Sequence, residues 1–185
     1  MTEQVCQDQR AGVYPGSFDP PTIAHLAIAV MARRAAELER VDLVVSRQAL
    51  AKESADNAPF ELRLQVIEAS IAHAAWMRVV VTDDQLIADI AQDYDAVILG
   101  SDKWAQVVDP SFYDGEAGRD AAIARLPQVV GPNRPDTPPL PDSAMLLELP
   151  ARLQTVSSTE ARTSRPDWMT PPARKTAEAQ GIWGL

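Results

Sequence analysis

The segment from Gly12 to His25 constrains this chain more than any other. A short apolar run leads into the turn-forming stretch Gly16 to Pro21, and helical spacing begins around Thr22. The pattern predicts a buried strand, a tight turn and the start of a helix that Asp19 caps, with Pro20 and Pro21 in its first turn. Backbone N–H groups at a helix N-terminus point outward in a partial positive field, and the hydroxyl and imidazole of Thr22 and His25 add donors there. This position therefore suits a polyphosphate.

Strand-like and helical segments alternate beyond this turn. Strands are expected at 11–16, 41–46, 77–82 and 96–100, and helices follow the first turn and cover 60–75 and 84–92. This alternation predicts an α/β fold with right-handed crossovers and a parallel sheet. Because ligands bind beyond the carboxyl ends of such strands, the regions around Gly16, Ser46 and Gly100 are expected to converge on one cleft.

The late part of the chain is less regular. Five prolines between 131 and 143 indicate an extended connection, and Ala144 to Leu149 suggests a last strand. Ser157 and Glu160 have the spacing of a capping box, which predicts a helix start. We expect an N-terminal tail at 1–10, one domain at 11–165 and a C-terminal extension at 166–185.

Composition excludes several classes of protein. The chain has 185 residues, of which 46% are hydrophobic, so it can bury one core. A net charge of −9 argues against nucleic acid as a partner, and no apolar run approaches the roughly 18 residues of a membrane span. One cysteine and two histidines exclude a disulfide framework and an ordinary structural zinc site, and they favour a reducing cytoplasm. The oligomeric state stays open.

Two segments carry a resemblance to a known superfamily. Gly16-Ser17-Phe18-Asp19-Pro20, followed by Thr22-Ile23-Ala24-His25, resembles the first motif of the adenylyl- and cytidylyltransferases. About 130 residues later, Val156-Ser157-Ser158-Thr159-Glu160-Ala161-Arg162 resembles their Ile-Ser-Ser-Thr-x-x-Arg motif. Ala24 replaces a family glycine. The resemblance implies a single-domain, Rossmann-like enzyme with helices on both faces of its sheet.

Two weaker matches point within this superfamily. Lys52 with Arg63-Leu64, and the Gly100-Ser101-Asp102 segment with Trp104, are similar to stretches of nicotinate mononucleotide adenylyltransferases. That likeness implies ATP as a substrate, Mg²⁺ leaving with pyrophosphate, and a mononucleotide 5′-phosphate as the acceptor.

The resemblance also assigns residues to roles. Thr22, His25, Lys52 and Arg162 are expected to act on the phosphates. The nucleotide-binding set comprises Gly16, Ser17, Phe18, Gly100, Asp102, Trp104, Ser157, Ser158 and Thr159. Each has a plainer alternative: Thr22 and His25 as ordinary first-turn residues, Lys52 as a solvated loop lysine, Asp102 as a helix cap, Trp104 as core, and the Ser157 segment as a simple capped helix.

Other functions stay open at this stage. Phosphopantetheine adenylyltransferases and cytidylyltransferases share the first motif. A nucleotide-binding protein without turnover is a further alternative, because the methyl group of Ala24 would crowd the phosphates if it faced them.

Overall fold

A six-stranded parallel sheet forms the centre of the computed structural model, which describes residues 10–48, 58–134 and 137–185. Its order is β3-β2-β1-β4-β5-β6, so successive strands are added on one side of β1 up to β3 and on the other side from β4 onward. The strands are β1 (Ala11–Pro15), β2 (Arg40–Ser46), β3 (Met77–Thr82), β4 (Ala96–Ile98), β5 (Gln128–Gly131) and β6 (Met145–Leu146). The predicted α/β class and parallel sheet are confirmed.

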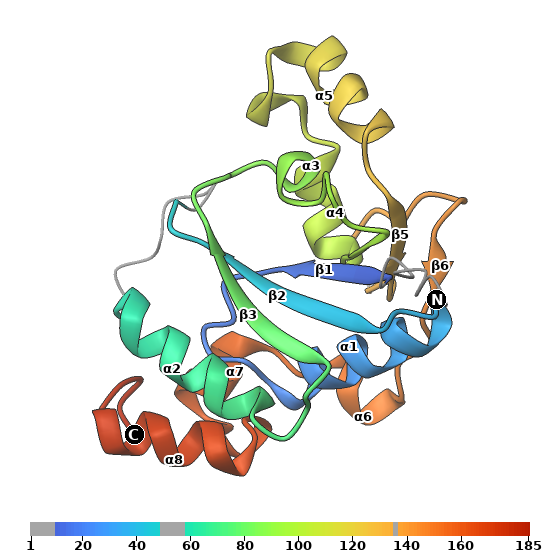
Figure 1. Cartoon of the computed structure of the whole chain (residues 1–185). Helices are drawn as coiled ribbons and strands as arrows, with labels where there is room; N and C mark the ends of the chain where they lie inside the picture. Colours follow the sequence, from blue (N-terminus) through green and yellow to red (C-terminus); the bar gives the residue numbers. More distant parts are fainter. Residues whose placement is uncertain (1–9, 49–57, 135–136) are drawn as a thin grey trace, which may run out of the picture.

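Helices cover both faces of this sheet (Figure 1). One face carries α1 (Ile23–Ala35) and α2 (Phe60–Ile71), and the other carries α3 (Ile87–Ile90), α4 (Ser101–Val107) and α5 (Gly115–Ala124). Alternate β2 residues enter the two cores: Leu43 faces α1 and α2, and Val44 faces the α3 and α4 side. The remaining elements are α6 (Ala151–Gln154), α7 (Ser158–Thr163), α8 (Pro171–Gln180) and two 3₁₀ turns at Pro110–Phe112 and Pro166–Trp168.

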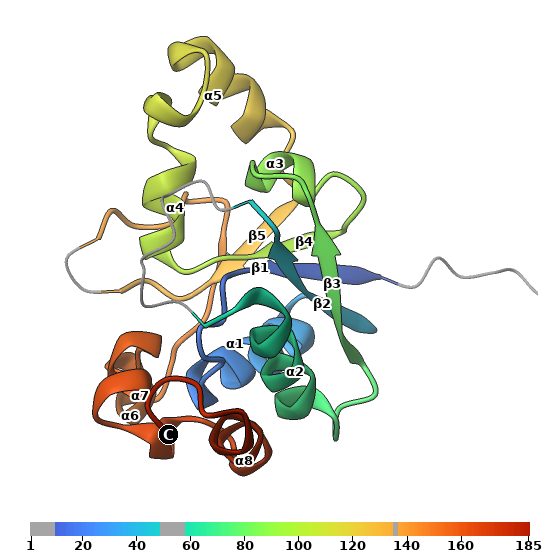
Figure 2. The same cartoon turned by 90° about the vertical axis from the view of Figure 1, so that its left-hand side faces the viewer.

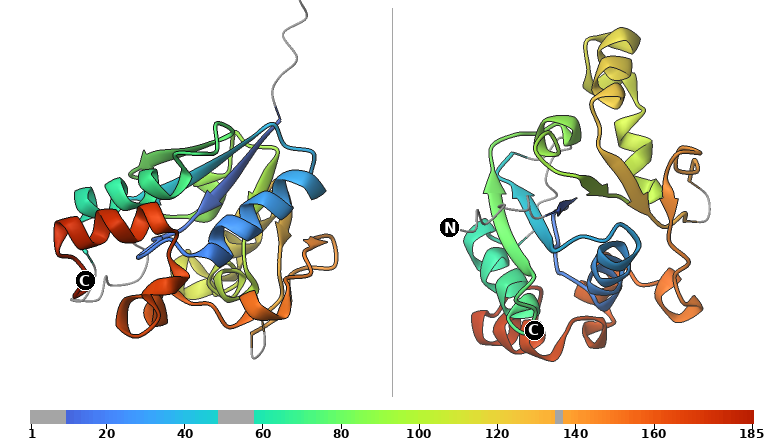
Figure 3. Two further views of the ribbon diagram at one scale, coloured as in Figure 1. Left: turned by 90° about the horizontal axis from the view of Figure 1, so that it is seen from below. Right: turned by 45° about the vertical axis from the view of Figure 1, so that its right-hand side comes forward.

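Residues 166–185 pack on the sheet-bearing unit. Helix α8 lies alongside α2 (Figures 2 and 3), and Ala173, Ala177 and Ile182 share an apolar cluster with Val66 of α2. Gly181 ends α8 in the left-handed conformation, with φ 63°, and Ile182 directly after it belongs to the same cluster. The boundary expected at residue 165 stays a prediction, and the expected tail at 1–10 lies almost wholly outside the described residues.

Three local expectations were wrong. Asp19 does not cap α1, because Thr22 takes the N-cap position and Pro20 and Pro21 precede the helix. Helix α2 stops at Ile71. The last strand is only Met145–Leu146, since residues 147–150 leave the sheet.

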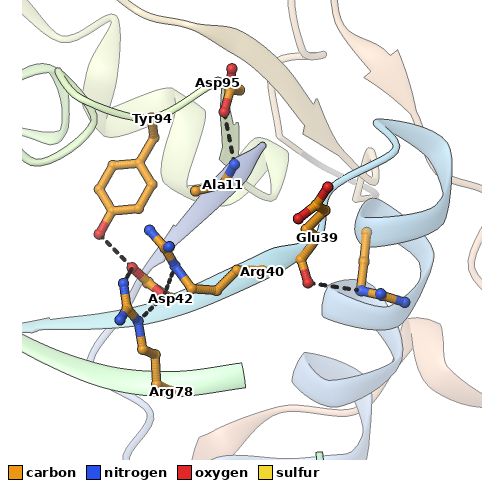
Figure 4. Close-up of polar contacts among 8 residues, drawn as sticks. Ala11, Glu39, Arg40, Asp42, Arg78, Tyr94 and Asp95 are labelled. Carbon is orange, nitrogen blue, oxygen red and sulfur yellow. Dashed lines mark hydrogen bonds and ion pairs between the residues drawn. The ribbon is translucent and has the colours of Figure 1, made fainter. Parts of the chain in front are cut away.

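A buried carboxylate on β2 joins this strand to the edge strand β3 in the amino-terminal half of both (Figure 4). Asp42 of β2 is 1% exposed and accepts from Arg78 of β3 at 2.8 and 3.2 Å, Arg40 at 3.0 Å and the Tyr94 hydroxyl at 2.9 Å. These donors lower the pKa of Asp42 against the opposing effect of burial. Burial, followed by the bond to Asp42, raises the pKa of Tyr94 to about 12. The network ties β2 to β3 and to the segment before β4.

Candidate nucleotide-binding site

A pocket of about 280 Å³ opens at the carboxyl ends of β1 and β4, where the strand order reverses. The turn after β1 supplies Gly16, Ser17 and Phe18, and the segment after β4 supplies Gly100 and Asp102. Ser157 and Ser158 close the pocket from the far end of the sequence. The two motifs that are distant in sequence therefore share one cavity, whereas Ser46 does not line it.

The turn after β1 has a shape that only certain residues permit. Phe18 has φ 45°, in the left-handed region, and its ring packs edge-on against Tyr14 and His25 with centroids 5.3 Å from each. A Cβ at Gly16 would lie 2.9 Å from that ring. Gly16 thus allows Phe18 to fold back under the turn, and the strained backbone is held by aromatic packing.

His25 is locked to the start of its own helix. Its Nδ1 accepts the Thr22 backbone N–H at 3.0 Å and lies 2.8 Å from Thr22 Oγ1, while Thr22 Oγ1 accepts the His25 backbone N–H at 3.4 Å. Because Nδ1 accepts, the single proton of a neutral imidazole is on Nε2. The ring lines the pocket, so it offers one N–H donor there.

Burial and, to a smaller extent, the nearby Arg134 cation lower the pKa of His25 to about 4, against the opposing effect of Asp102. The imidazole is therefore neutral at pH 7. A neutral donor binds an oxyanion through its N–H without needing a proton from solution.

Two cationic side chains line the pocket but were not among the predicted site residues. Lys103 of α4 donates to Gln106 Oε1 at 2.9 Å, and burial lowers its pKa. Arg134 is positioned by its backbone N–H, which donates to Ser101 Oγ at 2.7 Å. Neither has a sequence signal of its own, since Arg134 stands in the proline-rich connection and Lys103 looks like a surface helix residue.

The pocket is more positive than the chain around it. Lys103 and Arg134 face one carboxylate, Asp102, whose Oδ1 lies 3.6 Å from Arg134 Nε. That distance exceeds a hydrogen bond. Arg134 Nε is buried and has no acceptor among the described residues. A local excess of positive charge and an open donor favour an anionic ligand even though the whole chain carries −9.

The second motif contacts the first directly. Ser157 caps α7 and accepts the Glu160 backbone N–H at 3.2 Å, as the capping-box spacing predicted. The Ser158 hydroxyl donates to the Pro20 carbonyl at 2.8 Å. Arg162 donates to the carbonyl of Asp19 and, at 3.3 Å, to its Oδ2. This arrangement places Arg162 behind the turn rather than in the pocket wall.

The predicted site residues divide into two groups. The pocket is lined by Gly16, Ser17, Phe18, His25, Gly100, Asp102, Ser157 and Ser158. Thr22 is fully buried and acts on His25, and Thr159 is exposed on α7. Trp104 is 7% exposed in the core beside Val13 and Leu99 and borders a different cavity, so the structure does not bring it to the pocket. Lys52 lies outside the described residues.

Ala24 faces away from the pocket. It is 1% exposed and packs with Leu153 and Val156 in an apolar cluster beneath α6. The alanine methyl group therefore joins α1 to the segment before α7, and the crowding considered from the sequence does not arise at this position.

The described residues contain no cluster of three or more His, Cys, Asp or Glu side chains that could hold a metal ion. Asp102 is the one carboxylate among the residues lining the pocket. In the same described part, no helix has the length and apolar character needed to cross a membrane.

A parallel sheet in this order, with a pocket at the carboxyl ends of β1 and β4, is the architecture of the doubly wound α/β class, whose members bind nucleotides at this point of the sheet. The sequence model of the Cytidylyltransferase-like family matches residues 13–164. The chain belongs to this family.

Relatives within the family are adenylyltransferases. A probable nicotinate-nucleotide adenylyltransferase of Chlorobaculum tepidum is 41% identical over 66 residues, which is 34% of each chain. The match thus spans about a third of that relative. Two Plasmodium falciparum nicotinic acid mononucleotide adenylyltransferase structures, complexed with NaAD and with APC, have TM-scores of 0.64 and 0.66 at 14% identity, covering 95% of this chain and 97% of theirs. At that identity they support the fold.

Proposed function

We propose that this protein transfers the adenylyl group of ATP to the 5′-phosphate of nicotinate mononucleotide and releases pyrophosphate. One observation carries the proposal: the Gly16–His25 turn and the Ser157–Ser158 segment line the same pocket, which also holds Lys103 and Arg134. The match to a nicotinate-nucleotide adenylyltransferase supports the choice of acceptor.

The reaction needs positioning and charge neutralisation more than a catalytic base. A phosphate oxygen of the acceptor attacks the α-phosphorus of ATP, a new P–O–P bond forms, and the bond from the α-phosphorus to the bridging oxygen breaks as pyrophosphate leaves. The attacking phosphate is already anionic. Orientation alone supplies roughly 7–11 kcal/mol in such reactions.

Different residues of the chain position the phosphates and neutralise their charge. The Nε2–H of His25 donates to a phosphate oxygen, and Thr22 fixes that ring from behind. Lys103 and Arg134 neutralise charge that develops as pyrophosphate leaves. Mg²⁺ enters as the magnesium complex of ATP, held mainly by the phosphates, since ions of this kind bind proteins through one or two carboxylates plus substrate oxygens. Arg162 holds the turn through Asp19.

The test is pyrophosphate release with each nucleotide and acceptor. ATP or CTP is mixed with Mg²⁺ and nicotinate mononucleotide, nicotinamide mononucleotide, phosphopantetheine or phosphocholine, and products are identified by mass. We expect nicotinate adenine dinucleotide from the first acceptor with ATP. A different preferred acceptor would overturn the assignment of substrate, and nucleotide binding without any product would favour a non-catalytic protein.

His25→Ala supplies the control for the site. Loss of one donor aimed at developing charge costs about 10²–10³ in kcat in comparable sites. We therefore expect the dinucleotide-forming rate to fall by that factor. A rate within twofold of the wild type would remove His25 from the chemistry.

A further inference from the structure

We propose that Trp183, in the segment beyond the family match at 13–164, is a positioning residue for the nucleotide pocket, acting through Asp19. The proposal rests on the proposed function for its kinetic test and has a second test that does not need turnover. Trp183 does not line the pocket, so its effect must pass through another residue.

Asp19 is the point where four segments of the chain meet. Its side chain is 3% exposed, and the indole Nε1–H of Trp183 donates to Oδ1 at 2.8 Å. The backbone N–H of Ala58 also donates to Oδ1, at 3.4 Å. The guanidinium of Arg162 donates to Oδ2 at 3.3 Å. A buried carboxylate needs such donors, and each oxygen here has its own.

The backbone conformation after α8 determines where the indole of Trp183 lies. Gly181 has φ 63°, Trp183 φ 58° and Gly184 φ 71°, so three of four consecutive residues adopt left-handed backbone. Ile182, between Gly181 and Trp183, packs in the apolar cluster that joins α8 to α2 and so holds this segment in place. A tryptophan in the left-handed region is held against its own preference. The surrounding packing therefore fixes the direction in which the ring points.

The position of Asp19 affects the pocket through both of its neighbours in the sequence. Phe18, the preceding residue, lines the pocket and packs on His25. The carbonyl of Pro20, the following residue, accepts from Ser158, which also lines the pocket. Fixing the carboxylate of Asp19 thus fixes the turn of the first motif relative to the second. Without the indole donor, Oδ1 keeps only the longer bond from the Ala58 N–H, at 3.4 Å, and the carboxylate is held less firmly.

The kinetic test replaces Trp183 with phenylalanine, which keeps one aromatic ring but removes the N–H donor and part of the apolar surface of the indole. Small displacements of positioned groups cost up to about 10² in rate, so we expect kcat to fall by about tenfold. The KM for ATP should change less than threefold, because Trp183 does not touch the pocket. Trp168→Phe is the matched control: that ring stacks under Arg165 at 4.5 Å in the same tail, and its kcat should stay within twofold.

The second test follows the indole N–H signals of the ¹⁵N-labelled full-length protein. The chain has four tryptophans, and comparison with Trp183→Phe assigns the Trp183 signal. We expect that signal to shift on adding the non-hydrolysable ATP analogue with a methylene α,β-bridge, while the Trp168 signal stays. A Trp183 signal that ignores the analogue, or a Trp183→Phe kcat within twofold of the wild type, would overturn the proposal. Failure of every acceptor to react would count against the proposed function alone.

Discussion

Stability should depend on pH through His25, and the structure sets both sign and size. The folded-state pKa is about 4, whereas an unfolded histidine titrates near 6.5. Between these values the unfolded chain binds a proton that the folded chain does not. The free energy of unfolding therefore falls as pH drops from 6.5 to 4.

The magnitude follows from the difference between the two pKa values. At 1.36 kcal/mol per pH unit the full effect approaches about 3 kcal/mol. Because one edge of the ring meets water in the pocket, we expect about 2 kcal/mol. His25→Asn removes the titrating group and can keep an acceptor near Thr22, so its stability should lack this dependence.

The assay is urea unfolding followed by circular dichroism, at pH 7.5, 6.5, 5.5 and 4.5. We expect the stability difference between wild type and His25→Asn to shrink by about 2 kcal/mol across this range. His73→Asn, which alters an exposed histidine, should cost under about 0.5 kcal/mol at pH 7.5. A difference between wild type and His25→Asn that is the same at every pH would refute the assignment of a neutral, buried imidazole.

Three further substitutions test the fold around the site. Asp42→Asn should cost about 2–4 kcal/mol in urea unfolding at pH 7, because two arginines lose a buried carboxylate but stay partly hydrated. Since the pKa of Asp42 is lowered, this deficit should shrink below about pH 4, and an unchanged deficit at pH 3 would contradict the network. Ala24→Gly should lower the free energy of unfolding by about 1–2 kcal/mol, and with it the melting temperature, while kcat stays within twofold. A fivefold gain in kcat would mean that the methyl group does face the phosphates. Gly131→Ala should give little soluble folded protein, because its Cβ would lie 1.6 Å from the Leu99 carbonyl oxygen; a wild-type melting curve would refute that contact.

The fold could be predicted from the sequence because its signals are local. Apolar runs gave β2, β3 and β4 within two residues, and the Ser157–Glu160 spacing gave the start of α7. Where two local signals competed, the wrong one was chosen. Asp19 and Thr22 are both good caps, and only the burial of Asp19 by Arg162 and Trp183 leaves the cap to Thr22.

The pocket could be predicted only in part. Its two motifs carry a distinctive order of residue types, so the sequence could predict that His25 and Ser158 lie at one pocket. Lys103 reaches the pocket from α4. Arg134 reaches it through the loop between β5 and β6, whose path is set by long-range bonds such as the one from Arg134 N–H to Ser101. No spacing in the sequence encodes such a bond. The sequence left Trp104 between the pocket and the core, because a tryptophan after a strand packs equally well on a base or in a core, and the structure has it in the core.

A crystal structure with the methylene-bridged ATP analogue and Mg²⁺ tests the central claim most directly. The account predicts that the triphosphate lies between His25 Nε2 and the Ser157–Ser158 segment, with Arg134 contacting it. A triphosphate bound elsewhere on the molecule, with His25 left untouched, would contradict it.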